Sequence, residues 1–83
     1  FRISLNKDFM TLDQLTENET GIINSINDED LAIQLLAMGF ILGGEVKVER
    51  IAPLKDPILI TSGSNYISIR KNDAKNIDIN PIK

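Results

Sequence analysis

The 83-residue chain contains no cysteine, no histidine and no tryptophan. Without cysteine there is no disulfide, and without cysteine and histidine the usual zinc and iron–sulfur ligands are missing. The same absences remove thiol nucleophiles and imidazole acid–base catalysis. No apolar run approaches the roughly 20 residues of a membrane span, and no signal pattern opens the chain. We therefore expect a cytoplasmic, non-enzymatic domain with no catalytic residues, no cofactor, no metal site and no membrane insertion.

The charge of −3 is unevenly distributed along the chain. Seven acidic side chains, and neither Lys nor Arg, lie between Asp8 and Asp30, whereas seven basic residues face five acidic ones from Leu31 onward. Nucleic-acid binding needs a concentrated basic stripe that displaces counterions from phosphates. The sequence therefore predicts no nucleic-acid partner and favours an acidic surface that meets a basic patch on another protein.

One helix is predicted, starting at an N-cap at Asn27 and ending at Gly39. The acidic residues 28–30 fall in its first turn, where the helix dipole favours negative charge. Because consecutive helix residues point in different directions, we assign these carboxylates to capping rather than to metal binding. The buried stripe is expected at i, i+4 and i+7, namely Leu31, Leu35 and Met38.

Alternating aliphatic residues separated by turn residues predict five short strands, with a bulge near Arg50. A short helical turn is expected over 11–15, with Leu12 and Leu15 on one face. Closing the strands into a barrel removes exposed sheet edges. We therefore predict a mainly β, five- to six-stranded barrel with one inserted α-helix. Its inward residues would be Ile22, Ile26, Leu35, Met38, Phe40, Val46, Val48, Ile58, Ile60, Ile67, Ile69, Ile77 and Ile79.

The order of these motifs resembles the ferrous iron transport protein A (FeoA) family of SH3-like barrels. The matching motifs are Met38-Gly39-Phe40, Gly43-Gly44, Val46-x-Val48, Ala52-Pro53, Asp56-Pro57, Gly63, Ile67-x-Ile69-Arg70, Ala74 and Ile77-x-Ile79. The chain departs from the family pattern at Leu42, commonly Pro, and at Lys55, usually Gly. We expect the FeoA-like domain to span 10–83, with 1–9 as an N-terminal extension or tag remnant.

The resemblance implies an accessory protein of ferrous iron uptake that binds and regulates the membrane transporter FeoB from its cytosolic side, including its GTPase region. An alternative is that the barrel is a C-terminal regulatory module of an iron- or manganese-dependent transcriptional repressor. The sequence leaves open whether the chain forms a weak homo-oligomer.

Two segments are candidates for partner contact. The first is a loop bracketed by prolines, which reduce its unfolded-state entropy; its candidate residues are Ala52, Pro53, Leu54, Lys55 and Asp56. This segment could also be a plain connector between strands. The second comprises Ile33 and Leu36, which lie off the buried helix stripe and would leave apolar surface exposed. Alternatively, residues 1–10 of the chain itself, rather than a partner, cover this surface.

Overall fold

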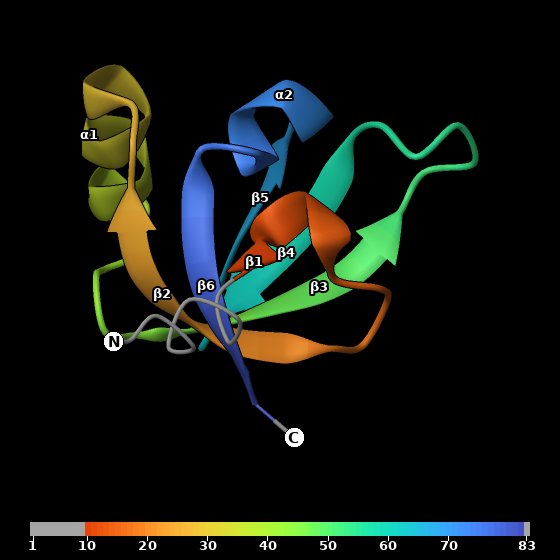
Figure 1. The fold of residues 1–83 in the computed structure, drawn as a ribbon, viewed down its shortest axis with the longest axis horizontal. Coiled ribbons are helices and arrows are strands. Elements are labelled where there is room, and N and C mark those ends of the chain that lie inside the picture. Colours follow the sequence, from red (N-terminus) through yellow and green to blue (C-terminus); the bar gives the residue numbers. More distant parts are fainter. Residues whose placement is uncertain (1–9, 83) are drawn as a thin grey trace, which may run out of the picture.

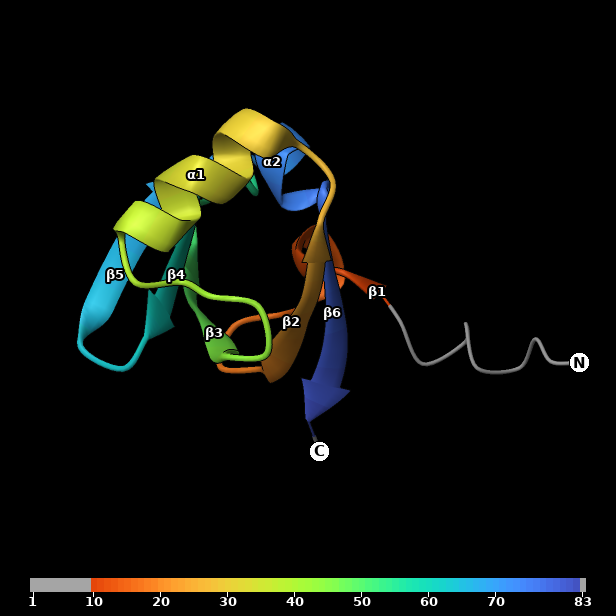
Figure 2. The ribbon, with the colours of Figure 1, turned by 90° about the vertical axis from the view of Figure 1, so that its left-hand side faces the viewer.

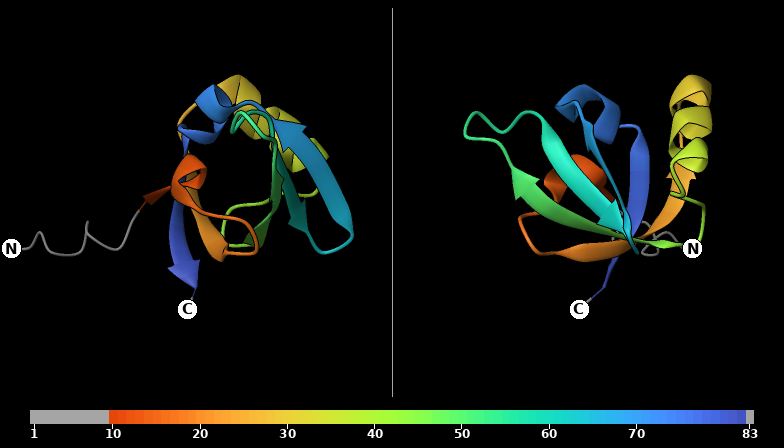
Figure 3. Two further views of the ribbon diagram at one scale, coloured as in Figure 1. Left: turned by 90° about the vertical axis from the view of Figure 1, so that its right-hand side faces the viewer. Right: turned by 180° about the vertical axis from the view of Figure 1, so that it is seen from behind.

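Six antiparallel strands form a single curved sheet in the computed structural model, which describes residues 10–82. The strand order is β1-β6-β2-β3-β4-β5, and the sheet curls into the open barrel of Figures 1 and 3. The strands are β1 (Met10–Thr11), β2 (Thr20–Ile26), β3 (Glu45–Ile51), β4 (Ile58–Ser62), β5 (Asn65–Ile69) and β6 (Ile77–Ile82). The mainly β, SH3-like barrel is confirmed, while the predicted extension over 1–9 lies outside the described residues.

Three short helical segments complete the fold: the 3-10 turn η2 (Leu12–Gln14), α1 (Glu29–Ala37) and α2 (Lys71–Ala74). The helix α1 connects β2 to β3 and runs across one side of the barrel, from the end of β2 toward β5 (Figure 2). Its Leu31 and Leu35 point inward and are buried. The predicted N-terminal turn and the helix inserted between β2 and β3 are therefore confirmed.

The helix α1 is capped by Asp28, so the predicted cap at Asn27 is wrong by one residue. The Asp28 carboxylate accepts a hydrogen bond from the backbone N–H of Leu31 at 3.1 Å. The Asn27 amide instead donates to the Asp78 carboxylate at 3.2 Å. Both residue types are good caps, so propensity does not distinguish them.

Removal of the cap gives a first test of this geometry. We expect Asp28→Ala to lower the free energy of unfolding by about 1 kcal/mol, because the Leu31 N–H loses its acceptor. Asn27→Ala should cost less, since it removes only one exposed hydrogen bond. Urea unfolding of both variants measures the difference, and a larger loss for Asn27→Ala would contradict the assignment.

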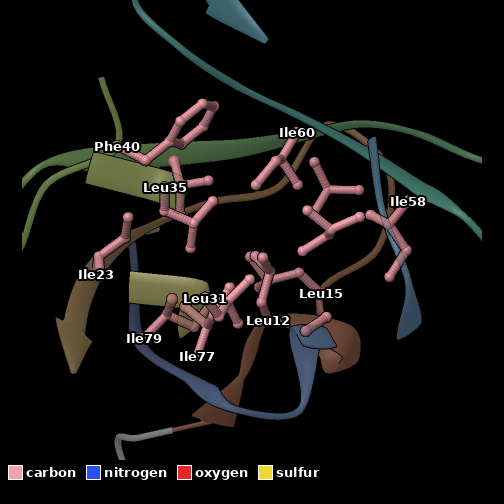
Figure 4. Close-up of a cluster of buried hydrophobic side chains, with 14 residues drawn as sticks. Leu12, Leu15, Ile23, Leu31, Leu35, Phe40, Ile58, Ile60, Ile77 and Ile79 are labelled. Atoms are coloured by element: carbon pink, nitrogen blue, oxygen red, sulfur yellow. The ribbon is translucent and has the colours of Figure 1, made fainter. Parts of the chain in front are cut away.

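Among residues 10–82, the core consists of 14 buried hydrophobic side chains from every element except β1 (Figure 4). Nine predicted inward residues belong to it: Leu35, Phe40, Val46, Val48, Ile58, Ile60, Ile69, Ile77 and Ile79. The others are Leu12, Leu15, Ile23, Leu31 and Ala74. Burial of these aliphatic groups is the main stabilising contribution in a domain without disulfides.

Four predicted inward residues are not fully buried. Ile26 and Ile67 are only partly buried and pack against the core. Ile22 is half-buried, because β2 turns Gly21 and Ile23 inward instead. Met38 is 43% exposed, since α1 ends at Ala37 and the following turn brings Phe40 into the core in its place.

Two register shifts bend the sheet. One lies between Val48 and Arg50 on β3, as predicted from the broken alternation near Arg50. The second lies between Ile23 and Ser25 on β2, opposite β6, and was not predicted. Bulges of this kind increase local twist and help a short sheet to close.

The turn before β2 contains a carboxylate with a perturbed pKa. The Glu19 carboxylate accepts a hydrogen bond from the Thr16 backbone N–H at 2.7 Å. Hydrogen bonds from the Thr16 backbone, and then from its side chain, hold the pKa of Glu19 below its ordinary value. We expect the stabilisation from this contact to be complete above the pKa of the unfolded chain and lost as the pH falls through the folded-state pKa. An NMR titration of the Glu19 carboxyl carbon measures this pKa. A titration midpoint at or above the ordinary pKa of a glutamate would contradict the prediction.

Candidate interaction surface

The loop between β3 and β4 is held in place at both ends. The Ala52 N–H donates to the Pro57 carbonyl oxygen at 3.1 Å, and the Lys55 N–H donates to that of Ala52 at 2.7 Å. The Asp56 carboxylate accepts a hydrogen bond from the backbone N–H of Lys71 at 3.0 Å, which ties the loop to α2. Lys55 has a positive φ of 69°, a conformation that favours glycine.

Most of this loop faces solvent. Leu54 is 90% exposed, Pro53, Lys55 and Asp56 are exposed and Ala52 is half-buried. However, Leu54 is the one large apolar side chain that this loop exposes, and single exposed residues of this kind are normal on protein surfaces. The geometry therefore gives a well-held loop but no apolar patch.

The outer face of α1 is different, because its exposed apolar residues continue into the next segment. Ile33 and Leu36, the two predicted residues on this helix, are 63% and 62% exposed. The chain then leaves α1 and turns back beneath it toward β2 (Figure 2). On this return segment Ile41 and Leu42 are also exposed. Together these side chains form a larger apolar surface than the sequence indicated.

A groove of about 360 Å³ runs between α1 and this return segment. We call it the α1 groove; it is lined by Ile26, Ala32, Leu36, Phe40, Ile41 and Leu42. All six lining residues are apolar, so the groove suits hydrocarbon side chains rather than a polar cofactor. Ile33 lies on the same helix but does not line the groove.

The wall formed by residues 41–44 is fixed by backbone hydrogen bonds to β2. The Gly43 N–H donates to the Ile23 carbonyl oxygen at 2.8 Å, and the Ile23 N–H donates to that of Gly44 at 3.0 Å. A turn bond from the Gly44 N–H to the Ile41 carbonyl oxygen, 3.0 Å, closes the segment. The groove is therefore built into the fold, which lowers the ordering cost of binding.

The two predicted surfaces lie on opposite sides of the molecule: the β3–β4 loop on one side and α1 on the other (Figures 1 and 3). The structure does not bring them into one site. Ile41 and Leu42 were not predicted, although two adjacent aliphatic residues between a helix end and a glycine turn indicate exposed apolar surface.

Two further features concern metal-binding clusters and membrane-spanning helices. Within residues 10–82, no group of three or more Asp, Glu, His or Cys side chains is placed to hold a metal ion. In the same part of the chain, no helix is long and apolar enough to cross a bilayer.

Comparison with known proteins identifies the fold. The model of the FeoA domain family matches residues 10–81. The FeoA protein of Chlorobium tepidum is 27% identical with a TM-score of 0.83, over 89% of this chain and 71% of that one. The FeoA of Stenotrophomonas maltophilia, solved with zinc and described as an SH3 domain protein, is 27% identical with a TM-score of 0.73, over 84% and 88%.

A third similar structure is a manganese-dependent transcriptional repressor, with a TM-score of 0.77 at 16% identity, over 89% of this chain and 42% of that one. This likeness shows the fold alone. A comparison with curated protein sequences gave no match. Because the family model covers nearly the whole described chain, the protein belongs to the FeoA family of iron-uptake accessory proteins.

Proposed function

We propose that this chain is a non-enzymatic, cytoplasmic accessory protein that binds the cytosolic part of a FeoB-like ferrous iron transporter and regulates it, through or near its GTPase region. Residues 10–83 form the functional domain in this proposal, and residues 1–9 are an extension. The iron is the cargo of the transporter, and the accessory protein acts by recognition.

The observation that supports this proposal is the α1 groove in a FeoA-family chain. Exposed apolar patches on small proteins often mark protein contacts. Here Leu36 and Leu42 are each 62% exposed beside the groove, and α1 is otherwise anchored through Leu31 and Leu35. Residues on this face are therefore available to a partner without disturbing the core.

The β3–β4 loop is a second contact candidate within the same proposal. Its backbone is held by the Asp56–Lys71 hydrogen bond, so Leu54 is presented on a fixed support. Prolines and a tied backbone reduce the entropy lost when a loop is bound.

Titration of the ¹⁵N-labelled chain with the purified cytosolic part of the transporter, followed by NMR, tests the proposal. We expect saturable shifts in residues 32–42, in the 52–57 loop, or in both. Absence of any shift at high molar excess, with the partner shown to be folded by its nucleotide binding, would overturn it.

The alternative is that the barrel is a regulatory module of an iron- or manganese-dependent repressor, a class of protein in which the same fold occurs. That alternative requires a DNA-binding domain in the same polypeptide, whereas an accessory protein of the transporter does not. Reading the coding sequence on both sides of residues 1–83 discriminates between the two.

A further inference from the structure

The α1 groove lies beside a concentration of negative charge. Glu29 and Asp30 occupy the first turn of α1 and are exposed. Glu29, Ile33 and Leu36 follow one another at i, i+4 and i+7, so they share one face of the helix. The apolar surface therefore has an acidic end.

Within residues 10–82, neither of these two carboxylates takes part in an ion pair. From Met10 to Val46 the chain contains neither Lys nor Arg. The salt bridge found in the described part of the chain joins Lys47 to Glu49 on β3, not to α1. The acidic end is thus open to a cation from a partner.

The apolar groove and its acidic end together indicate which kind of partner could bind there. An anionic lipid surface would be repelled by Glu29 and Asp30, because membrane surfaces attract basic rather than acidic patches. A second copy docked symmetrically through the same face would bring another acidic turn rather than a cation, because α1 and its return segment contain no Lys or Arg. An apolar segment with Lys or Arg at one end satisfies both features, and cytosolic segments of membrane proteins carry an excess of these residues.

We infer that the α1 groove receives a short amphipathic helix with aliphatic anchors on one face and Lys or Arg at one end. The anchors insert between Leu36 and Leu42, and the basic end lies over Glu29 and Asp30. Helices bind apolar grooves in this way through residues at i, i+3 or i+4, and i+7. The inference rests on the proposed function and specifies its partner segment.

A designed peptide tests the inference without the transporter. The probe is a short helical peptide with leucines at i, i+4 and i+7 and lysines at one end, titrated into the full ¹⁵N-labelled chain. We expect shifts confined to residues 26–42. Control peptides carry the same residues in scrambled order, or glutamates in place of the lysines, and should bind at least about tenfold more weakly.

Matched variants separate the apolar and charged contributions. Leu36→Asn/Leu42→Asn should weaken binding about tenfold or more, whereas Leu54→Asn should leave it unchanged. Glu29→Gln/Asp30→Asn should weaken binding roughly two- to fivefold at low salt and flatten its salt dependence. Glu45→Gln/Glu49→Gln removes the same charge from a depression beside Thr61 and Ser62 and should have no effect. All four positions in the test variants are exposed, so the variants should stay folded, with only a small fall in melting temperature from the lost first-turn charges and the lower helix propensity of Asn.

The competing occupants give distinct results. If groove resonances change with protein concentration, a second copy occupies the groove and the inference is wrong. If Phe1→Ser/Phe9→Ser shifts the groove resonances and strengthens peptide binding, the chain's own residues 1–9 occupy it and the inference is again overturned. Binding to anionic vesicles that shifts residues 26–42 would replace it with a lipid contact.

The two proposals fail separately. If the cytosolic part of the transporter binds Leu36→Asn/Leu42→Asn as well as the unchanged chain, the inference is wrong while the proposed function stands. If the designed peptide binds as expected but the transporter does not, the groove is a helix receptor for another protein and the proposed function fails.

Discussion

Leu35→Ala is expected to lower the free energy of unfolding by about 2–5 kcal/mol. Leu35 is completely buried. The backbone N–H of Phe40 donates to the carbonyl oxygen of Leu35 at 2.8 Å, and the two side chains lie close together in the core (Figure 4). Removing its isobutyl group loses the transfer free energy and leaves a cavity that close-packed neighbours fill only in part. In a domain of this size, such a loss is a large share of the total stability.

The neighbouring residue provides a matched control. Leu36→Ala deletes the same atoms one position along the helix, where the side chain is 62% exposed. We expect a change within about 0.5 kcal/mol, as for surface substitutions generally. Urea unfolding monitored by circular dichroism measures both variants. Equal losses at the two positions would show that α1 packs with a different face against the barrel.

Much of the barrel could be predicted because alternation follows directly from burial on one side of a strand. Val46 and Val48 on β3, and Ile77 and Ile79 on β6, are buried as expected. The bulge near Arg50 was predictable as well, since Ile51 breaks the alternation and the register does shift there.

The inward face of β2 was mispredicted for an equally physical reason. Ile22 and Ile23 are adjacent and chemically identical, so periodicity alone cannot say which of them faces inward. The close approach of β6 decides it: a Cβ on Gly21 would lie 2.9 Å from the carbonyl oxygen of Asn80. Gly21 thus faces inward where only a glycine fits, and Ile23 follows on the same side.

The interaction surface was predictable in part. Ile33 and Leu36 could be found because they lie off the helix stripe that the core requires. Ile41 and Leu42 could not be assigned to the same surface, since the direction of the return segment depends on its hydrogen bonds to Ile23. Those contacts join residues of separate elements, and no local pattern encodes them.

The second large loss of stability that we predict comes from substituting Gly39, which follows the end of α1. Gly39 has a φ of +91°, and a Cβ at this position would overlap the side-chain amide of Asn65 on β5. We therefore expect Gly39→Ala to lower the free energy of unfolding by about 1–2 kcal/mol through backbone strain, with a smaller further loss from displacing the exposed side chain of Asn65. Thermal and urea unfolding of the variant measure the sum.

Gly43 separates these two contributions, because it shares the conformation but not the contact. Its φ is +83°, and no atom lies within 4 Å of the position that a Cβ would take. Gly43→Ala should therefore cost only the backbone strain, about 1–2 kcal/mol. In an Asn65→Ala background the loss caused by Gly39→Ala should fall to the same value. If Gly39→Ala costs no more than Gly43→Ala in the unchanged chain, the exposed Asn65 side chain rotates away without cost and the contact adds nothing to the strain. If Gly39→Ala costs less than about 0.5 kcal/mol, the left-handed conformation at the end of α1 is wrong.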